Sequence, residues 1–91
     1  MSAYVATYDL RKPGWNYEPL WTRLRKWGAV RVLESVWVID ANPGSAVAIR
    51  DDLKNYIDSN DGILVSGPNG ELAWDNLIDG SGQFLLKRFA A

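Results

Sequence analysis

The first residues whose types and spacing could support chemistry lie at positions 8–12. Asp9 ends an apolar run that includes Tyr8, and Arg11 and Lys12 follow it closely. A carboxylate in this setting has two possible roles. It accepts hydrogen bonds from backbone amides in the turn at residues 11–14, as Asp often does, or it lies at the centre of a functional site.

The composition narrows the chemistry open to this chain. Its 91 residues include no cysteine and no histidine, which excludes disulfides, thiol nucleophiles and the usual zinc ligands. Any catalysis must therefore depend on carboxylates, hydroxyls, Lys or Arg. No apolar run approaches the roughly 20 residues that span a bilayer, so we expect a soluble, cytoplasmic protein with no membrane partner.

Charged residues are unevenly distributed, although the formal net charge is only −1. Residues 1–31 carry six cations and two acids, whereas residues 32–80 carry nine acids and two bases. This asymmetry fits a basic face that contacts nucleic-acid phosphates, and it equally fits solvated helix faces. The candidate phosphate contacts in the basic segment are Arg11, Lys12, Arg23, Arg25 and Lys26.

The elements that must position these residues begin with a strand and a helix. Residues 3–8 are rich in β-branched and aromatic side chains, which predicts a buried strand that Asp9 closes. Asn16 is expected to cap a helix that stops before Gly28. Its apolar stripe has a width that would suit stacked bases, but packing on a sheet is the simpler role. The stripe consists of Tyr17, Leu20, Trp21, Leu24 and Trp27.

The rest of the chain predicts two further strands, a helix and a strand. Residues 29–40 alternate in polarity except at Glu34-Ser35, which predicts two antiparallel strands joined there by a tight turn or bulge. Ser45 is expected to cap a second helix with an apolar stripe. That stripe consists of Ile49, Leu53, Tyr56 and Ile57. The remaining predicted elements are a strand at residues 63–65, a turn at 67–70, a short fifth strand at 71–74 and a terminal amphipathic helix or arm at 81–91.

This order predicts a single α+β domain over residues 1–91. We expect a ferredoxin-like βαββαβ plait, with an extra fifth strand and a C-terminal helix or arm. Two helices with one apolar stripe each would cover one face of the antiparallel sheet. The other face is then left for a partner, and a homodimer through that face is the expected solution.

Three stretches in this order resemble the CRISPR-associated protein 2 family. They are YVATYDL at residues 4–10, RVLESVWVID at residues 31–40 and IDSNDGILV at residues 57–65. Tyr8-Asp9 matches the aromatic-Asp pair at the end of the family's first strand, and Arg31 with Ser35-Val36-Trp37 resembles its Arg-x-x-x-Ser-Val-aromatic motif. The loop at residues 11–17 is closer to the SinR-like, non-CRISPR branch, and the VapD toxins are distant relatives.

The resemblance implies a homodimer in which each fifth strand joins the partner's sheet and Asp9 faces its symmetry mate. The aspartate pair would hold one Mg²⁺ and activate water to cleave RNA or DNA. Asp9 is then both the catalytic residue and the metal ligand. The implied nucleic-acid contacts are Arg11, Lys12 and Arg31, and the supporting residues are Tyr8, Ser35 and Trp37.

Two alternatives come with the same resemblance. A non-catalytic dimer would hold nucleic acid and an integrase-type protein together, whereas a ribonuclease toxin of the VapD type would have an antitoxin partner. Leu33 stands where many members have Gln or Asn, so the resemblance in fold is stronger than the resemblance in activity.

Overall fold

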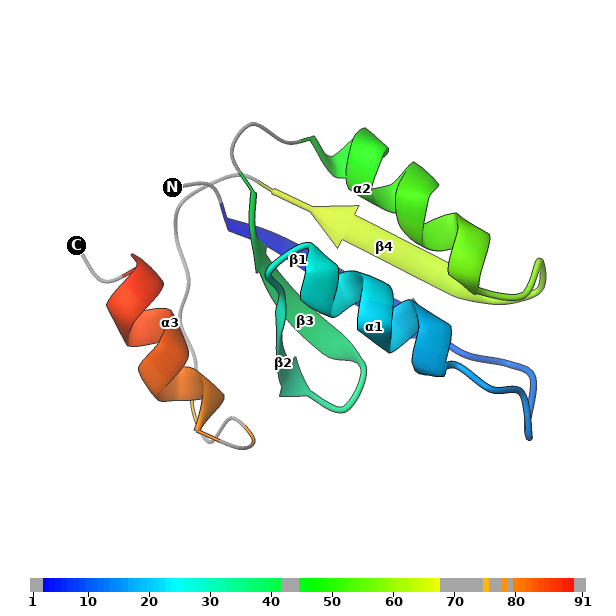
Figure 1. Cartoon of the computed structure of the whole chain (residues 1–91), viewed down its shortest axis with the longest axis horizontal. Helices are drawn as coiled ribbons and strands as arrows, with labels where there is room; N and C mark the ends of the chain where they lie inside the picture. The colour runs from blue at the N-terminus through cyan, green and yellow to red at the C-terminus, as the bar shows by residue number, and fades with distance from the viewer. Residues whose placement is uncertain (1–2, 42–44, 68–74, 76–77, 79, 90–91) are drawn as a thin grey trace.

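The computed structural model describes residues 3–41, 45–67 and 80–89, together with residues 75 and 78. Over this part of the chain, an antiparallel sheet has the strand order β2-β3-β1-β4 (Figure 1). The strands are Ala3–Asp9 (β1), Val30–Leu33 (β2), Val36–Asp40 (β3) and Gly62–Ser66 (β4). The helical elements are Glu18–Lys26 (α1), Ala46–Leu53 (α2), the 3₁₀ turn Lys54–Tyr56 (η1) and Ser81–Phe89 (α3).

This arrangement confirms the predicted α+β fold of ferredoxin-like type. The central strand β1 pairs with β3 on one side and β4 on the other, as the plait requires. The terminal segment is a helix, α3, which settles the choice between helix and arm. The predicted fifth strand at residues 71–74 lies outside the described residues. No helix in the described segments is long and apolar enough to cross a membrane.

Alternation along the strands divides the sheet into two faces. One face carries the even-numbered residues of β1 and the odd-numbered residues Trp37 and Ile39 of β3, and it packs against α1 and α2. The helices contribute apolar side chains at helical spacing, which is why each buries a single stripe. The helix residues fully buried in this main core are Leu20, Leu24, Ile49 and Leu53.

The first helix begins slightly later than the sequence predicts. Asn16 Oδ1 accepts a hydrogen bond from the Glu18 amide at 3.0 Å, and the helix starts at Glu18 with Pro19 in its first turn. Tyr17 therefore precedes the helix, yet its ring is buried in the main core. At the other end Gly28 has a φ of +78°, the left-handed conformation that ends a helix and favours glycine.

The second helix has the predicted cap but ends earlier than predicted. Ser45 Oγ accepts a hydrogen bond from the Ala48 amide at 3.0 Å. The α-helix stops at Leu53, so the expected stripe is wrong beyond that residue: Tyr56 lies in η1 and Ile57 is extended. Asn55 gives a physical reason, because its side-chain amide donates to the carbonyls of Asp51 and Asp52, at 3.3 and 3.2 Å, and competes with the backbone there.

Helix α3 covers part of the opposite sheet face. Leu85 and Phe84 pack against valines of β2 and β3 in a second, smaller cluster. Ile78, just before α3, donates its amide to the Val32 carbonyl of β2 at 3.1 Å. Figure 1 shows α3 beside β2 and apart from α1 and α2. The chain thus fills part of the face that the sequence leaves for a partner, while Leu64 of β4 is 62% exposed.

Candidate nucleic-acid interface

The hydroxyl of Tyr8 is the centre of a hydrogen-bond network at the end of β1. It accepts from the indole nitrogens of Trp21 and Trp37, at 3.1 and 3.0 Å, and donates to the Glu34 carbonyl at 3.4 Å. The Ser35 carbonyl accepts from the Tyr8 amide at 3.2 Å. Because both indoles bond to one buried oxygen, the two rings hold fixed positions against the sheet.

Two guanidinium groups from different elements lie beside these indoles. The Arg31 Cζ atom of β2 lies 5.1 Å from the Trp21 ring centre and 5.7 Å from the Trp37 ring centre. The Arg25 Cζ atom of α1 lies 5.8 Å from the Trp37 ring centre. Arg31 also donates Nε and Nη2 to the Glu34 carbonyl, with Nε at 2.8 Å. Cation–π contacts and these bonds hold the Arg31 head group in one orientation.

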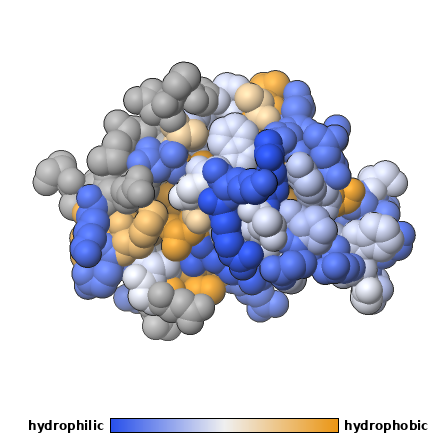
Figure 2. All heavy atoms as spheres, in the orientation of Figure 1, coloured by the Kyte–Doolittle hydropathy of each residue, from blue (hydrophilic) through white to orange (hydrophobic). Residues whose placement is uncertain are grey.

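A surface hollow of about 260 Å³ opens beside Arg31. It brings together four of the residues that the resemblance places at a site, namely Tyr8, Asp9, Arg31 and Ser35. Trp37 is buried and does not line the hollow, but it contacts two residues that do, Tyr8 through its hydroxyl and Arg31 through the ring face. Figure 2 shows strongly hydrophilic side chains over the part of the viewed face where Figure 1 places α1. The arrangement offers guanidinium donors beside aromatic rings, which suits phosphate and base contacts.

Asp9 lies at the border between this hollow and a second one on the β4 side. Its side chain is 73% exposed and pairs with Arg11 Nε at 3.0 Å. A hard cation prefers several oxygen ligands, whereas Asp9 offers one carboxylate that already contacts a guanidinium. The described segments hold no group of three His, Cys, Asp or Glu side chains suited to a metal.

The loop after β1 is held by an acid that the sequence reasoning missed. Asp61 Oδ1 accepts from the Arg11 backbone amide at 2.6 Å, so the acceptor for this turn amide is Asp61 and not Asp9. Asp61 Oδ2 accepts from the Tyr17 hydroxyl at 2.7 Å. Lys12 lies over the Trp15 ring, 4.1 Å from its centre, and pairs with Asp58 at 3.4 Å. Lys12 thus stabilises the loop through Trp15 and Asp58, and it does not line the Arg31 hollow.

These contacts shift two pKa values in opposite directions. Burial, the hydrogen bond to Asp61 and the charge of that carboxylate raise the pKa of Tyr17 to about 12. Burial alone would raise the pKa of Asp61. The hydrogen bonds from the Arg11 amide, the Tyr17 hydroxyl and the Asp58 amide outweigh that effect and lower it. The pair is therefore held as a neutral phenol and an ionised carboxylate.

A second missed acid, Asp52 of α2, binds the end of α1. Arg23 donates Nε and Nη2 to its two carboxylate oxygens, at 2.7 and 3.1 Å, and the Trp27 indole donates at 2.6 Å. The Arg23 hydrogen bonds lower the pKa of Asp52 despite partial burial, with help from Trp27. Arg23, expected as a phosphate contact, thus uses two of its hydrogen-bond donors to join the two helices. Little in the sequence indicated this contact, because Arg23 and Asp52 lie far apart in the chain.

Comparison with known proteins assigns no family to this chain. No protein-family model matches the chain, and no solved structure matches it. The chemistry of the site is therefore that of its own side chains: two arginines held beside two tryptophans, and an exposed carboxylate next to them that pairs with a third arginine.

Proposed function

We propose that this protein is a homodimeric, nucleic-acid-associated protein of the kind that its resemblance to the CRISPR-associated protein 2 family implies, and that its primary role is binding. The observation that carries this proposal is the convergence of Arg25 and Arg31 on the Trp37 indole. Guanidinium groups fixed by aromatic rings lose little freedom when they contact a phosphate, so they bind phosphates at low entropic cost.

The ion pair between Asp9 and Arg11 favours a binding role over a cleavage role. Its carboxylate is neutralised by Arg11 at 3.0 Å, and a shared cation would have to displace that guanidinium in both copies of a dimer. Phosphate contact leaves the Arg11–Asp9 pair in place. It uses the cations at the surface of α1 and β2, where Arg25 Nη1 lies 3.4 Å from Glu18 Oε1 in an exposed ion pair of the kind that contributes little energy.

Nucleic-acid binding is tested by fluorescence anisotropy with labelled single-stranded and duplex oligonucleotides. We expect salt-dependent binding that Arg31→Gln and Arg25→Gln each weaken about five- to tenfold, with a smaller salt slope. Arg50→Gln is the matched control, because this exposed arginine of α2 pairs with its neighbour Asp51 and lies outside the hollow. No binding by the wild type, or an equal loss in the control, would contradict the proposal. Light scattering after size exclusion tests the homodimer.

Metal-dependent cleavage of RNA or DNA is the second candidate. The observation in its favour is that the Asp9 carboxylate is exposed at the end of the central strand and borders the Arg31 hollow. A second copy would have to supply the other carboxylate. The test incubates labelled RNA and duplex DNA with Mg²⁺ or Mn²⁺ and compares the wild type with Asp9→Asn. Cleavage that the substitution leaves unchanged rules out this site.

The partner distinguishes the bridging role from the toxin role. An integrase-type protein that co-purifies with the dimer and nucleic acid supports the bridge. Growth arrest on expression, relieved by a co-expressed neighbouring gene product, supports a toxin with an antitoxin partner. Neither partner is needed for the binding activity itself, so the oligonucleotide assay comes first.

A further inference from the structure

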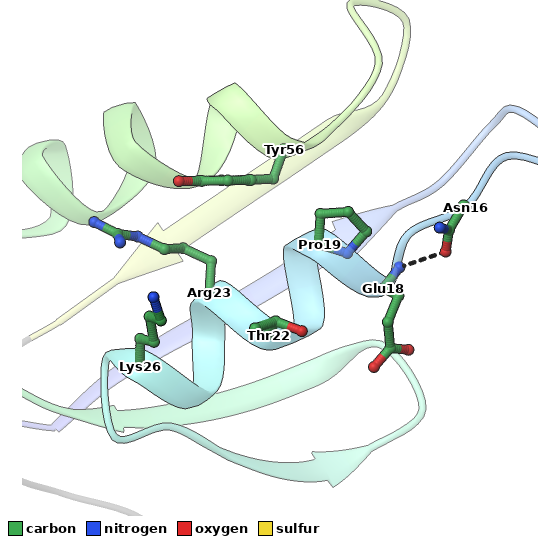
Figure 3. Close-up of a pocket in the computed structure, with 7 residues that line it drawn as sticks. All are labelled: Asn16, Glu18, Pro19, Thr22, Arg23, Lys26 and Tyr56. Carbon is green, nitrogen blue, oxygen red and sulfur yellow. Dashed lines mark hydrogen bonds between the residues drawn. The ribbon is translucent and has the colours of Figure 1, made fainter.

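A hollow between α1 and η1 is separate from the Arg31 site. Its volume is about 370 Å³, within the range of small-ligand sites. Figure 3 shows its walls, which come from residues far apart in the sequence. The lining residues are Asn16, Glu18, Pro19, Thr22, Arg23, Lys26 and Tyr56.

The hollow is a slot with an aromatic wall. In Figure 3 the Tyr56 ring lies above α1 and is seen edge-on, with Pro19 and Thr22 on the helix below it. Tyr56 is only partly buried, so part of its ring surface faces the opening. A planar ring opposite a proline accepts a flat aromatic group by stacking.

Two cations lie at one end of this slot. Arg23 Cζ is 5.9 Å from the Tyr56 ring centre, with two of its donors bound to Asp52. Lys26 lies beside it, and within the described part of the chain no acid forms an ion pair with this lysine. A further hollow of about 260 Å³, lined by Arg23, Lys26 and Trp27, continues past this end. Figure 3 shows the Glu18 carboxylate pointing away from the Tyr56 ring.

We propose that this slot binds a nucleotide unit, with its base stacked on Tyr56 and its phosphate at Lys26. An aromatic wall and a phosphate-binding cation at one end match the two halves of a nucleotide. If the nucleotide is part of a single strand, this inference rests on the proposed nucleic-acid binding. Binding of a free nucleotide in the slot does not depend on that proposed function. A duplex hides its base faces, so the slot selects unpaired nucleotides.

The first experiment titrates the full-length protein with adenosine monophosphate by calorimetry and by amide chemical shifts. Adenosine and inorganic phosphate serve as the half-ligands. We expect the nucleotide to bind at least about fivefold more tightly than either half, with shifts centred on Thr22, Arg23 and Tyr56. Equal binding of phosphate and nucleotide, or shifts centred elsewhere, would overturn the proposal.

Substitutions separate the two halves of the contact. Tyr56→Phe keeps the ring and should bind within about twofold of the wild type, whereas Tyr56→Leu should bind about fivefold or more weakly. Lys26→Gln should also weaken binding about fivefold, and Lys87→Gln, an exposed lysine of α3, should not. Binding that Tyr56→Leu leaves intact would refute stacking. Competition by a tetraglutamate peptide with equal strength would point to an acidic protein segment and overturn the nucleotide assignment.

A polymer experiment keeps this inference distinct from the proposed function. Single-stranded oligo-dA is compared with a duplex of the same length, using Arg31→Gln and Tyr56→Leu. The slot predicts that Tyr56→Leu weakens single-strand binding and leaves duplex binding unchanged. Monophosphate binding without any polymer binding would uphold the slot and refute the proposed function. If Arg31→Gln weakens polymer binding and Tyr56→Leu does not, the proposed function is upheld and the slot is refuted.

Discussion

The carboxylate of Asp61 accepts a hydrogen bond from the backbone amide of Arg11 at 2.6 Å, across 50 positions of sequence. The same side chain accepts from the Tyr17 hydroxyl and the Asp58 amide, at 2.7 and 2.8 Å. One residue just before β4 therefore fixes the loop between β1 and α1. Arg11, which neutralises Asp9, is held in place by this contact.

Replacement of Asp61 by Asn should destabilise the fold. The amide keeps the shape of the carboxylate but offers one acceptor oxygen to three donors, so we expect a loss of about 1–3 kcal/mol in the free energy of unfolding. Urea denaturation measures it. Asp51→Asn is the control, since that exposed carboxylate pairs only with Arg50 among the residues described. A loss no larger than the control's would show that the Asp61 contacts add little.

Acid should unfold the protein through Asp52 and Asp61. Both pKa values are lowered in the folded state. Each group therefore contributes stability that is present above the unfolded value, about 3.9, and is lost as the pH falls through the folded value. We expect the free energy of unfolding to fall below about pH 4, and to fall less steeply in Asp52→Asn. Identical acid slopes in the two proteins would contradict this assignment.

High pH should destabilise the fold through ionisation of Tyr17. Its pKa is raised to about 12 from the usual 10.0 because the ring is buried beside the Asp61 carboxylate. The stability that protonated Tyr17 contributes is complete below the pKa of the unfolded state and is lost as the pH rises through the pKa of the folded state. Ultraviolet absorbance should show a tyrosine ionisation near pH 12 that is missing in Tyr17→Phe. A titration curve unchanged by the substitution would count against the contact.

The attachment of α3 is tested by two neighbouring leucines. Leu85 is 2% exposed in the small cluster with Val32 and Val38, whereas Leu86 is 46% exposed. Leu85→Ala should cost about 2–4 kcal/mol of unfolding free energy if α3 unfolds with the rest of the domain, and Leu86→Ala well under 1. Thermal or urea unfolding measures both. Equal, small effects would mean that α3 is not part of the cooperative unit.

Asp9→Asn separates binding from cleavage. If phosphate binding is the role of this end of the sheet, loss of the negative charge leaves Arg11 bound only to the neutral Asn60 carbonyl among its described side-chain partners, and oligonucleotide affinity should rise about two- to threefold at low salt. If a metal bound by Asp9 holds the substrate, the same substitution should lower affinity in Mg²⁺. Anisotropy titrations with and without Mg²⁺ distinguish the two results.

Local patterns in the sequence were enough to predict most of the fold. Strand β1 ends where Asp9 interrupts the apolar run, Ser45 caps α2, and Glu34-Ser35 forms the tight turn between β2 and β3. Each of these features depends on residues within four positions of one another. The early end of α2 at Leu53 was not predicted although it is also local: the Asn55 side chain competes with the helix for the carbonyls of Asp51 and Asp52.

The site was less predictable because its contacts join distant positions. Nothing near Asp61 in the sequence indicates that its partner is the Arg11 amide, and Asp52 meets Trp27 only when α1 and α2 pack together. Tyr8, Asp9, Arg31 and Ser35, which the resemblance implies at one site, line a common hollow. The resemblance did not indicate that Trp21 would lie under Arg31, because the helical spacing of Trp21 predicts only a core position.

The bond between Ile78 and Val32 limits how this protein can associate by adding strands. An open sheet that grows into a fibril needs two free borders, one to receive a strand and one to offer the next. Here the β2 border is engaged by Ile78, and α3 packs against the same strand. Within the described part of the chain, strand addition is therefore obstructed at the β2 border, and a pairing partner is expected at the β4 border instead.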